Sequence, residues 1–192
     1  MVAIAGPPGS GKSTLAELLQ NAIAAGGDTA AVVPMDGFHF DDIVLEARGQ
    51  RARKGAPFTF DVAGFSILLK RIRAREPGVA IPVFDRNLEL SRNAAAIVGA
   101  DTRFILIEGN YLLLSRAPWR ELRSLFDFTI FLSVSVAALE ERLVQRWLGH
   151  GYDLNYATSW IASNDRPNIN EVMTQSLAAD LTIGTPAGTL LR

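Results

Sequence analysis

The chain has 192 residues, of which 48% are hydrophobic, and this is typical of one globular domain with a sizeable core. A formal net charge of −1 gives no general attraction to nucleic acid or to an anionic membrane, so neither is expected as a partner. The absence of cysteine excludes disulfides and thiolate metal sites, and we recognise no signal peptide or membrane span, so we expect a cytoplasmic protein.

The first predicted elements are a strand at 2–5, a glycine-rich loop and a helix at 13–25. This order matches the phosphate-binding loop of nucleotide-triphosphate enzymes. Glycines let backbone N–H groups surround phosphate oxygens, and the helix start adds its positive dipole end. We expect Lys12, on an exposed loop, to reach the β- and γ-phosphates and Ser13 to ligate Mg²⁺. The predicted nucleotide-binding residues here are Gly6, Pro7, Pro8, Gly9, Ser10, Gly11, Lys12, Ser13 and Thr14.

The second predicted strand, at 29–33, is followed by a cluster of acids and aromatic residues. Residues 36–42 read DGFHFDD. Asp36 lies where the strand gives out, and open parallel sheets place their sites at such ends. Asp41 and Asp42 could simply open a short helix predicted at 43–48. The segment 48–60 is basic and interrupted by proline and glycine, so we expect a loop or flap.

A second acidic signal ends the strand predicted at 104–107. Glu108 comes directly after that strand, and next to the first strand it would face the Mg²⁺. The alternative is a glutamate solvated at the sheet edge. The following Asn110 and Tyr111 could line an acceptor pocket or merely turn the chain.

Further helices are predicted at 62–75, 118–125 and 136–148, and further strands at 128–132 and 180–183. The alternation predicts an α/β fold with three layers, a mostly parallel sheet wrapped by helices on both faces. The helix at 136–148 has Ser135 as its N-cap and is closed by Gly149. It carries Arg142 and Arg146 on one face, which could also be a solvated basic face.

The phosphate-binding loop alone does not separate a kinase from a GTPase or a motor ATPase. An Asp-x-x-Gly spacing occurs at 61–64, but no Asn-Lys-x-Asp segment could read guanine. The chain also lacks the size or the dedicated segment of a motor. A small-molecule kinase is therefore favoured.

Five motifs occur in order: the phosphate-binding loop, MDGFH, RKGAPFTFD, IPVFDR and IEGNYLLL. Together they resemble the phosphoribulokinase, uridine kinase and pantothenate kinase superfamily over nearly the whole chain. Within it the chain is most similar to bacterial kinases described as fructose-transport-system or sugar kinases. The resemblance implies one P-loop kinase domain over 1–192, a helical lid at about 142–166 and an acceptor-side flap at about 37–60.

The resemblance also implies roles for single residues. It makes Asp36 the candidate base, which would lie near the γ-phosphate if the second strand is next to the first. With Lys12, the lid residues Arg142 and Arg146 would neutralise the transferred group. The predicted metal ligands are Ser13 and Glu108. The implied acceptor contacts are Asp36, His39, Arg53, Lys54, Asp61, Asp85, Arg86 and Tyr111. Asn168, in the segment NDRPN, is implied to belong to a loop beside the adenine.

Two of these assignments have structural alternatives. His39 could be a histidine packed between Phe38 and Phe40. Asp85 and Arg86 could form a surface ion pair of little consequence.

The sequence thus predicts an ATP- and Mg²⁺-dependent kinase that phosphorylates a hydroxyl of a small metabolite, with a sugar such as fructose favoured. Pantothenate or a nucleoside is the alternative acceptor. A non-catalytic nucleotide-binding switch is the alternative of another class, and a homodimer is a possible assembly.

Overall fold

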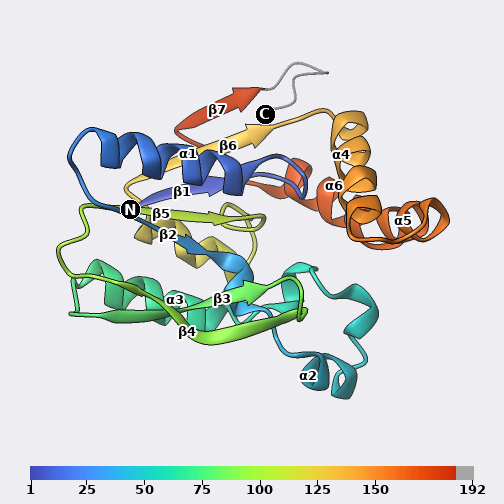
Figure 1. Ribbon diagram of the computed structural model, residues 1–192, viewed down its shortest axis with the longest axis horizontal. Coiled ribbons are helices and arrows are strands. Elements are labelled where there is room, and N and C mark those ends of the chain that lie inside the picture. Colours follow the sequence, from blue (N-terminus) through green and yellow to red (C-terminus); the bar gives the residue numbers. More distant parts are fainter. Residues whose placement is uncertain (185–192) are drawn as a thin grey trace.

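The computed structural model describes residues 1–184 and has a five-stranded parallel sheet at its centre (Figure 1). The strands lie in the order β2-β5-β1-β6-β7, and each neighbouring pair is parallel. Their bounds are Val2–Ala5 for β1, Ala30–Pro34 for β2, Phe104–Gly109 for β5, Phe128–Ser133 for β6 and Leu181–Gly184 for β7. The predicted α/β architecture is confirmed.

Helices cover both faces of this sheet. Successive strand residues point to opposite faces, so Ile4 packs with Ala16 of α1 on one side. Ala3 belongs to the core on the other side, with Phe65 of α3 and Trp119 of η4. The bounds are Lys12–Ala25 for α1, Val62–Arg73 for α3 and Trp119–Leu125 for the 3-10 helix η4. The sheet and the helices on its two faces are the three layers of the fold.

The strand order corrects one expectation, because β2 does not lie beside β1. β5 lies between them, and Glu108 at its end is level with Ile4 of β1 and with Pro34 of β2. Ile105 to Gly109 are all buried, as suits a strand in the middle of a parallel sheet. Chain order did not reveal this, because the crossover through α1 can skip a strand position.

A second sheet, an antiparallel hairpin, was not predicted. It consists of β3, Val79–Asp85, and β4, Leu90–Val98. Most of β4 is exposed, so its sequence lacks a clear apolar alternation. The hairpin backbone packs against the turn after β2: a Cβ on Gly37 would lie 2.3 Å from the carbonyl oxygen of Pro82. Only glycine permits this approach.

The remaining segments are short helices. On the flap side they are the 3-10 helix η1 (Met35–Phe38), α2 (Asp42–Ala47), and the 3-10 helices η2 (Arg51–Arg53) and η3 (Pro57–Thr59). On the lid side they are α4 (Val136–Gly149), α5 (Leu154–Trp160), the π-helix η5 (Ile161–Asp165) and α6 (Arg166–Gln175). None of the helices between residues 1 and 184 combines the length and apolar character that crossing a bilayer requires.

The lid side departs from the prediction after α4. The segment NDRPN was expected to be a loop, but it is helical, running from η5 into α6. Pro167 lies in the first turn of α6, a position at which proline is common. The N-cap predicted at Ser135 is confirmed, since its hydroxyl accepts from the backbone N–H of Ala138.

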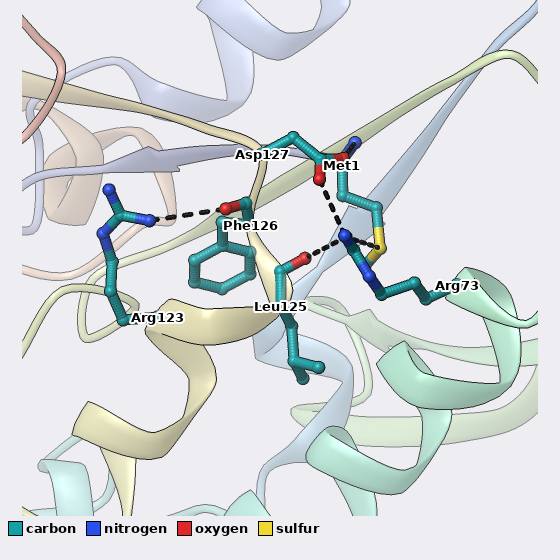
Figure 2. Close-up of polar contacts among 6 residues, drawn as sticks. All are labelled: Met1, Arg73, Arg123, Leu125, Phe126 and Asp127. Atoms are coloured by element: carbon teal, nitrogen blue, oxygen red, sulfur yellow. Dashed lines mark hydrogen bonds and ion pairs between the residues drawn. The ribbon is translucent and has the colours of Figure 1, made fainter.

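The amino end of the sheet is held by a set of polar contacts (Figure 2). The carboxylate of Asp127 accepts from the amino group of Met1 at 2.7 Å and from Arg73 of α3 at 2.9 Å. Arg73 also donates to the carbonyl of Leu125, at the end of η4, and Arg123 to that of Phe126. These contacts connect β1, α3 and η4 at the amino ends of the strands, so they do not occupy the carboxyl ends.

Candidate active site

A cleft of about 730 Å³ lies at the carboxyl ends of β1, β2 and β5. The phosphate-binding loop, the flap-side helices, the hairpin turn and the lid-side helices all contribute to its wall. Of the predicted site residues, the cleft is lined by Pro8, Gly9, Gly11, Lys12, Ser13, Thr14, Asp36, His39, Lys54, Arg86, Glu108, Arg142, Arg146 and Asn168. The structure therefore brings most of the predicted site together.

The loop before α1 is shaped to receive an anion. Gly9 and Gly11 have φ angles of +79° and +93°, which side-chain-bearing residues rarely adopt. Gly11 is the N-cap of α1 and provides no side chain to bond the first N–H groups of the helix. Those groups and the helix dipole can therefore meet a phosphate.

Lys12 is buried, contrary to the expected exposed position. Its Nζ donates to the carbonyl oxygen of Pro7 at 2.9 Å and to the hydroxyl of Ser10 at 3.4 Å. Burial lowers its pKa to about 8, although the charges of Glu108 and Asp36 oppose this. The ammonium group is thus held inside the loop, where a bound phosphate would stabilise its charge.

Glu108 and Ser13 form the pair that could hold a metal ion. Burial, and then the nearby charge of Asp36, raise the pKa of Glu108 to about 7, while Lys12 and the hydroxyl of Ser13 act in the other direction. The hydroxyl and carboxylate are oxygen ligands of the kind that Mg²⁺ prefers. Their contact beside Lys12 fits an ion that also touches phosphate.

Asp36 lies on η1, two residues after β2 ends at Pro34. Its carboxylate accepts a 2.7 Å hydrogen bond from Arg86 in the hairpin turn. Burial alone would raise the pKa of Asp36, but His39, Arg86 and Lys12 together bring it below its usual value. Asp36 is therefore an ionised carboxylate next to the phosphate-binding loop.

His39 is packed between aromatic rings, but not those expected. Its ring centroid lies 4.0 Å from that of Phe60 and 5.0 Å from that of Phe84. Burial lowers its pKa to about 4, so the imidazole is neutral at physiological pH and carries the charge that acts on Asp36 only in acid. Its Nδ1 is buried and makes no hydrogen bond within the described part of the chain.

Arg142 and Arg146, the two arginines expected in a lid, lie on α4 and line the cleft. Arg142 donates to the carbonyl oxygen of Gly9 at 3.3 Å. Arg146 is close enough to lower the pKa of Lys12 and of Asp36, although burial is the largest influence on each. Both arginines therefore lie on the cleft, Arg142 at the phosphate-binding loop and Arg146 within electrostatic reach of Lys12 and Asp36.

The flap is clamped to its surroundings by two basic residues. Lys54 donates to Asp42 at 2.7 Å and to the carbonyl oxygen of Glu89, in the hairpin turn, at 2.6 Å. Arg53 donates to Asn164 of η5 at 3.1 Å and to Asn168 of α6 at 3.2 Å. These bonds hold the flap against both the hairpin and the lid-side helices.

Four predicted acceptor contacts do not line the cleft. Arg53 points to the asparagines of η5 and α6, and Asp61 caps α3 by accepting from the N–H of Gly64. Asp85 accepts from the N–H groups of Asn87 and Leu88 and pairs with Arg92 rather than Arg86. Tyr111 is fully buried, and its hydroxyl donates to the carbonyl of Gly55. Each of them bonds to other groups of the protein instead. Asp41 caps α2 through the N–H of Ile43, as the simpler interpretation held.

Sequence reasoning missed several residues of the cleft. Those on the flap and hairpin are Arg51, Asn87 and Glu89; those on the lid side are Trp147, His150, Tyr152, Tyr156, Trp160, Asn164 and Asp165. The spacing of four between residues 152, 156 and 160 is a helical signal that could have indicated α5 and its aromatic side.

Comparison with known proteins agrees with this geometry. The model of the Phosphoribulokinase / Uridine kinase family matches residues 1–186. A crystal structure described as a "putative fructose transport system kinase" from Silicibacter sp. TM1040 is 47% identical, with a TM-score of 0.91, over 95% of this chain and 88% of that one.

Two curated relatives match over much of their length. "Uncharacterized protein YggC" of Escherichia coli is 35% identical over 95% of this chain and 76% of its own. The "Putative uridine kinase" of Schizosaccharomyces pombe is 34% identical over 79% of this chain and 67% of its own. With the phosphate-binding loop, the strand-end carboxylates and the family match over nearly the whole chain, this protein belongs to the phosphoribulokinase and uridine kinase family of P-loop kinases.

Proposed function

We propose that this protein transfers the γ-phosphoryl group of ATP to a hydroxyl of a small metabolite, and that the favoured acceptor is a sugar such as fructose. The observation that carries the proposal is the position of Asp36, an ionised carboxylate that shares one cleft with Lys12 and the start of α1. The similarity to a structure described as a fructose transport system kinase supports the acceptor class.

The roles of the residues follow from their positions. The N–H groups at the start of α1 and Lys12 bind the β- and γ-phosphates, and Arg142 and Arg146 neutralise charge that spreads over the transferred group. Ser13 and Glu108 would hold Mg²⁺, which neutralises phosphate charge when bound. Asp36 orients the acceptor hydroxyl and takes its proton. Since the chemistry is mostly positioning, a cleft filled by both substrates also excludes water as a competing acceptor.

The competing class is a nucleotide-binding switch that performs no transfer. Such a protein would need the phosphate-binding loop, but it would have no use for a carboxylate held ionised beside it. Pantothenate and nucleosides are the alternative acceptors, because the phosphate-side residues would serve them equally.

ADP release from ATP and Mg²⁺, measured with a panel of fructose, other sugars, pantothenate and nucleosides, tests the proposal. We expect one class of acceptor to raise the rate far above the acceptor-free rate. No increase with any compound of a broad panel would count against a kinase and favour the switch.

A further inference from the structure

Arg146 needs a group that holds its side chain in place. The side chain lines the cleft and is partly open to solvent, and its guanidinium lies over the face of Trp147, 5.8 Å from the ring centroid. At an exposed position such a contact contributes less free energy than the rotamer entropy that a fixed arginine loses. The ring of Trp147 alone is therefore too weak a partner to fix the guanidinium.

Three acids act on Arg146 through their charge, and one of them is better placed than the others. Desolvation between the cleft walls is the largest influence on the pKa of Arg146 and lowers it, as does Arg86. The acids act in the opposite direction, in the order Asp165, Asp36 and Glu89. Asp36 already bonds Arg86 at 2.7 Å, and Glu89 is exposed to solvent, which screens its charge. Asp165 is only 6% exposed, so its charge is screened least.

The stability of the fold does not explain why Asp165 is an acid. It ends η5, a π-helical turn of a kind that often occurs at functional sites. Burial raises the pKa of its carboxyl group, whereas Arg146 and the indole N–H of Trp147 lower it. Its Oδ2 and the Nε1 of Trp147 are both buried, yet neither completes a hydrogen bond within residues 1–184. A buried carboxylate with an unsatisfied oxygen destabilises a protein, so its presence indicates a function.

Packing fixes the position of Asp165 relative to Arg146. Arg146 and Trp147 belong to α4 and Asp165 belongs to η5, and the two elements share a hydrophobic cluster that includes Leu143 and Ile161. Trp147 has the guanidinium on its face and the carboxylate near its N–H. A charge held on packed helices is placed more exactly than one on a loop.

We propose that Asp165 is a positioning residue whose buried charge holds the guanidinium of Arg146 over Trp147, at the cleft, before the substrates bind. Asp165 itself contacts neither substrate. Arg146 is then in place when charge develops on the transferred group, and no reorganisation is needed at that moment. The inference rests on the proposed function, since it is there that Arg146 takes part in phosphoryl transfer.

Variants of the two charges separate positioning from other roles. Asp165→Asn keeps the size of the side chain and removes its charge, and Asp165→Leu replaces it where the first variant does not fold. Each is also combined with Arg146→Gln. Asp153→Asn is the matched control, because Asp153 caps α5 and asparagine caps a helix equally well. The measurements are ADP release, the Kd for ATP, thermal melting, and nitrogen NMR relaxation of the Arg146 Nε–H group, assigned by its loss in Arg146→Gln.

We expect Asp165→Asn to lower kcat roughly tenfold, as a misplaced catalytic group does, with an unchanged Kd for ATP. The melting temperature should not fall, because the freed Arg146 side chain can turn to solvent. The order parameter of its Nε–H group should drop below about 0.6, the range of a flexible group, and should stay unchanged in Asp153→Asn. In the Arg146→Gln background, Asp165→Asn should lower kcat no further, because it acts through Arg146.

Several results would overturn the inference. If neither Asp165 variant folds, or if the protein only melts earlier with an unchanged kcat, Asp165 is structural. An equal loss of kcat with and without Arg146, or weaker ATP binding as the main effect, would make Asp165 a direct ligand contact. Unchanged mobility of the Arg146 Nε–H group would contradict the positioning itself. If the wild type shows no acceptor-dependent turnover, the proposed kinase function fails, and the relaxation measurement decides the inference by itself: greater mobility supports it and unchanged mobility overturns it.

Discussion

The phosphate side and the acceptor side of the cleft are built in different ways. On the phosphate side, one continuous segment supplies the loop and the start of α1, and Lys12 bonds a carbonyl only five residues away. On the acceptor side, contacts join distant parts of the chain: Arg86 is 50 residues from Asp36, and Arg53 is 111 residues from Asn164.

This difference shows how one fold can retain a nucleotide site while its acceptor changes. The phosphate side depends on backbone geometry and on a buried lysine, so few substitutions are compatible with it. The proposed acceptor side depends on side chains from η2 and the hairpin turn, and each of these can vary without disturbing the parallel sheet. Substitutions on the two sides should therefore have separable effects on kinetics.

The largest effect is expected on the phosphate side. Lys12→Met should reduce kcat/KM on the order of 10³-fold or more, because it removes a preorganised charge on the transferred group. The melting temperature without ATP should not fall, since methionine fills the space and no cation remains buried. Thermal melts and ADP release check both points, and a protein that is unfolded at 25 °C would show that Lys12 is mainly structural.

Asp36→Asn comes next and tests the acceptor side. It keeps the size of the side chain but cannot take a proton, so kcat should fall on the order of 10²–10⁴-fold. ATP affinity should hardly change. Asp41→Asn is the matched control, because asparagine caps α2 as well as aspartate does. A small fall in kcat would mean that Asp36 orients the hydroxyl rather than deprotonating it.

Arg146→Gln should lower kcat by roughly 10²-fold with a smaller change in ATP affinity, since a lid arginine meets charge that grows in the transition state. Arg142→Gln, at the loop carbonyl of Gly9, should have the weaker effect. Arg120→Gln, on the exposed side of η4, serves as the control. If ground-state binding of ATP and kcat/KM decrease equally with kcat unchanged, Arg146 is a binding residue.

The smallest effect at neutral pH is expected for Arg86→Gln, which leaves Asp36 without its ion pair. Burial raises the pKa of both Asp36 and Glu108, and Arg86 lowers each, so removal of Arg86 should raise the pKa of both carboxyl groups. More of the base is then protonated at a given acidic pH, and the acid limb of kcat/KM against pH should move to higher pH. Arg92→Gln, elsewhere on the hairpin, should leave the limb in place. If the acid limb does not move in Arg86→Gln, Arg86 does not influence the protonation of the base.

The sequence predicts the features that arise from local patterns. The phosphate-binding loop is recognisable from glycine spacing, the central strands from their apolar runs, and the start of α4 from Ser135; the expected end at Gly149 is wrong, since Gly149 is helical and His150 is the C-cap. Glu108 was placed beside the first strand correctly, because an apolar run ending in a carboxylate indicates a buried strand end.

Other features depend on contacts that no local pattern encodes. The position of β5 between β1 and β2 depends on which strands pack most deeply. The hairpin is hard to predict from the sequence because β4 is exposed and lacks an apolar alternation. Gly37 is needed because Pro82 approaches it from a distant strand. For the same reason, sequence reasoning could not foresee that Arg53, Asp61, Asp85 and Tyr111 bond to other parts of the protein and do not line the cleft.

The central claim is that the γ-phosphoryl group moves to an alcohol. Phosphorus NMR of a reaction with ATP, Mg²⁺ and the acceptor that raises ADP release, starting with D-fructose, tests it most directly. The account predicts that loss of the γ-phosphate signal is matched one-to-one by a new phosphomonoester signal, and that Asp36→Asn slows both equally. A γ-phosphate signal that converts only to inorganic phosphate, at a rate independent of acceptor and of Asp36, would contradict the claim.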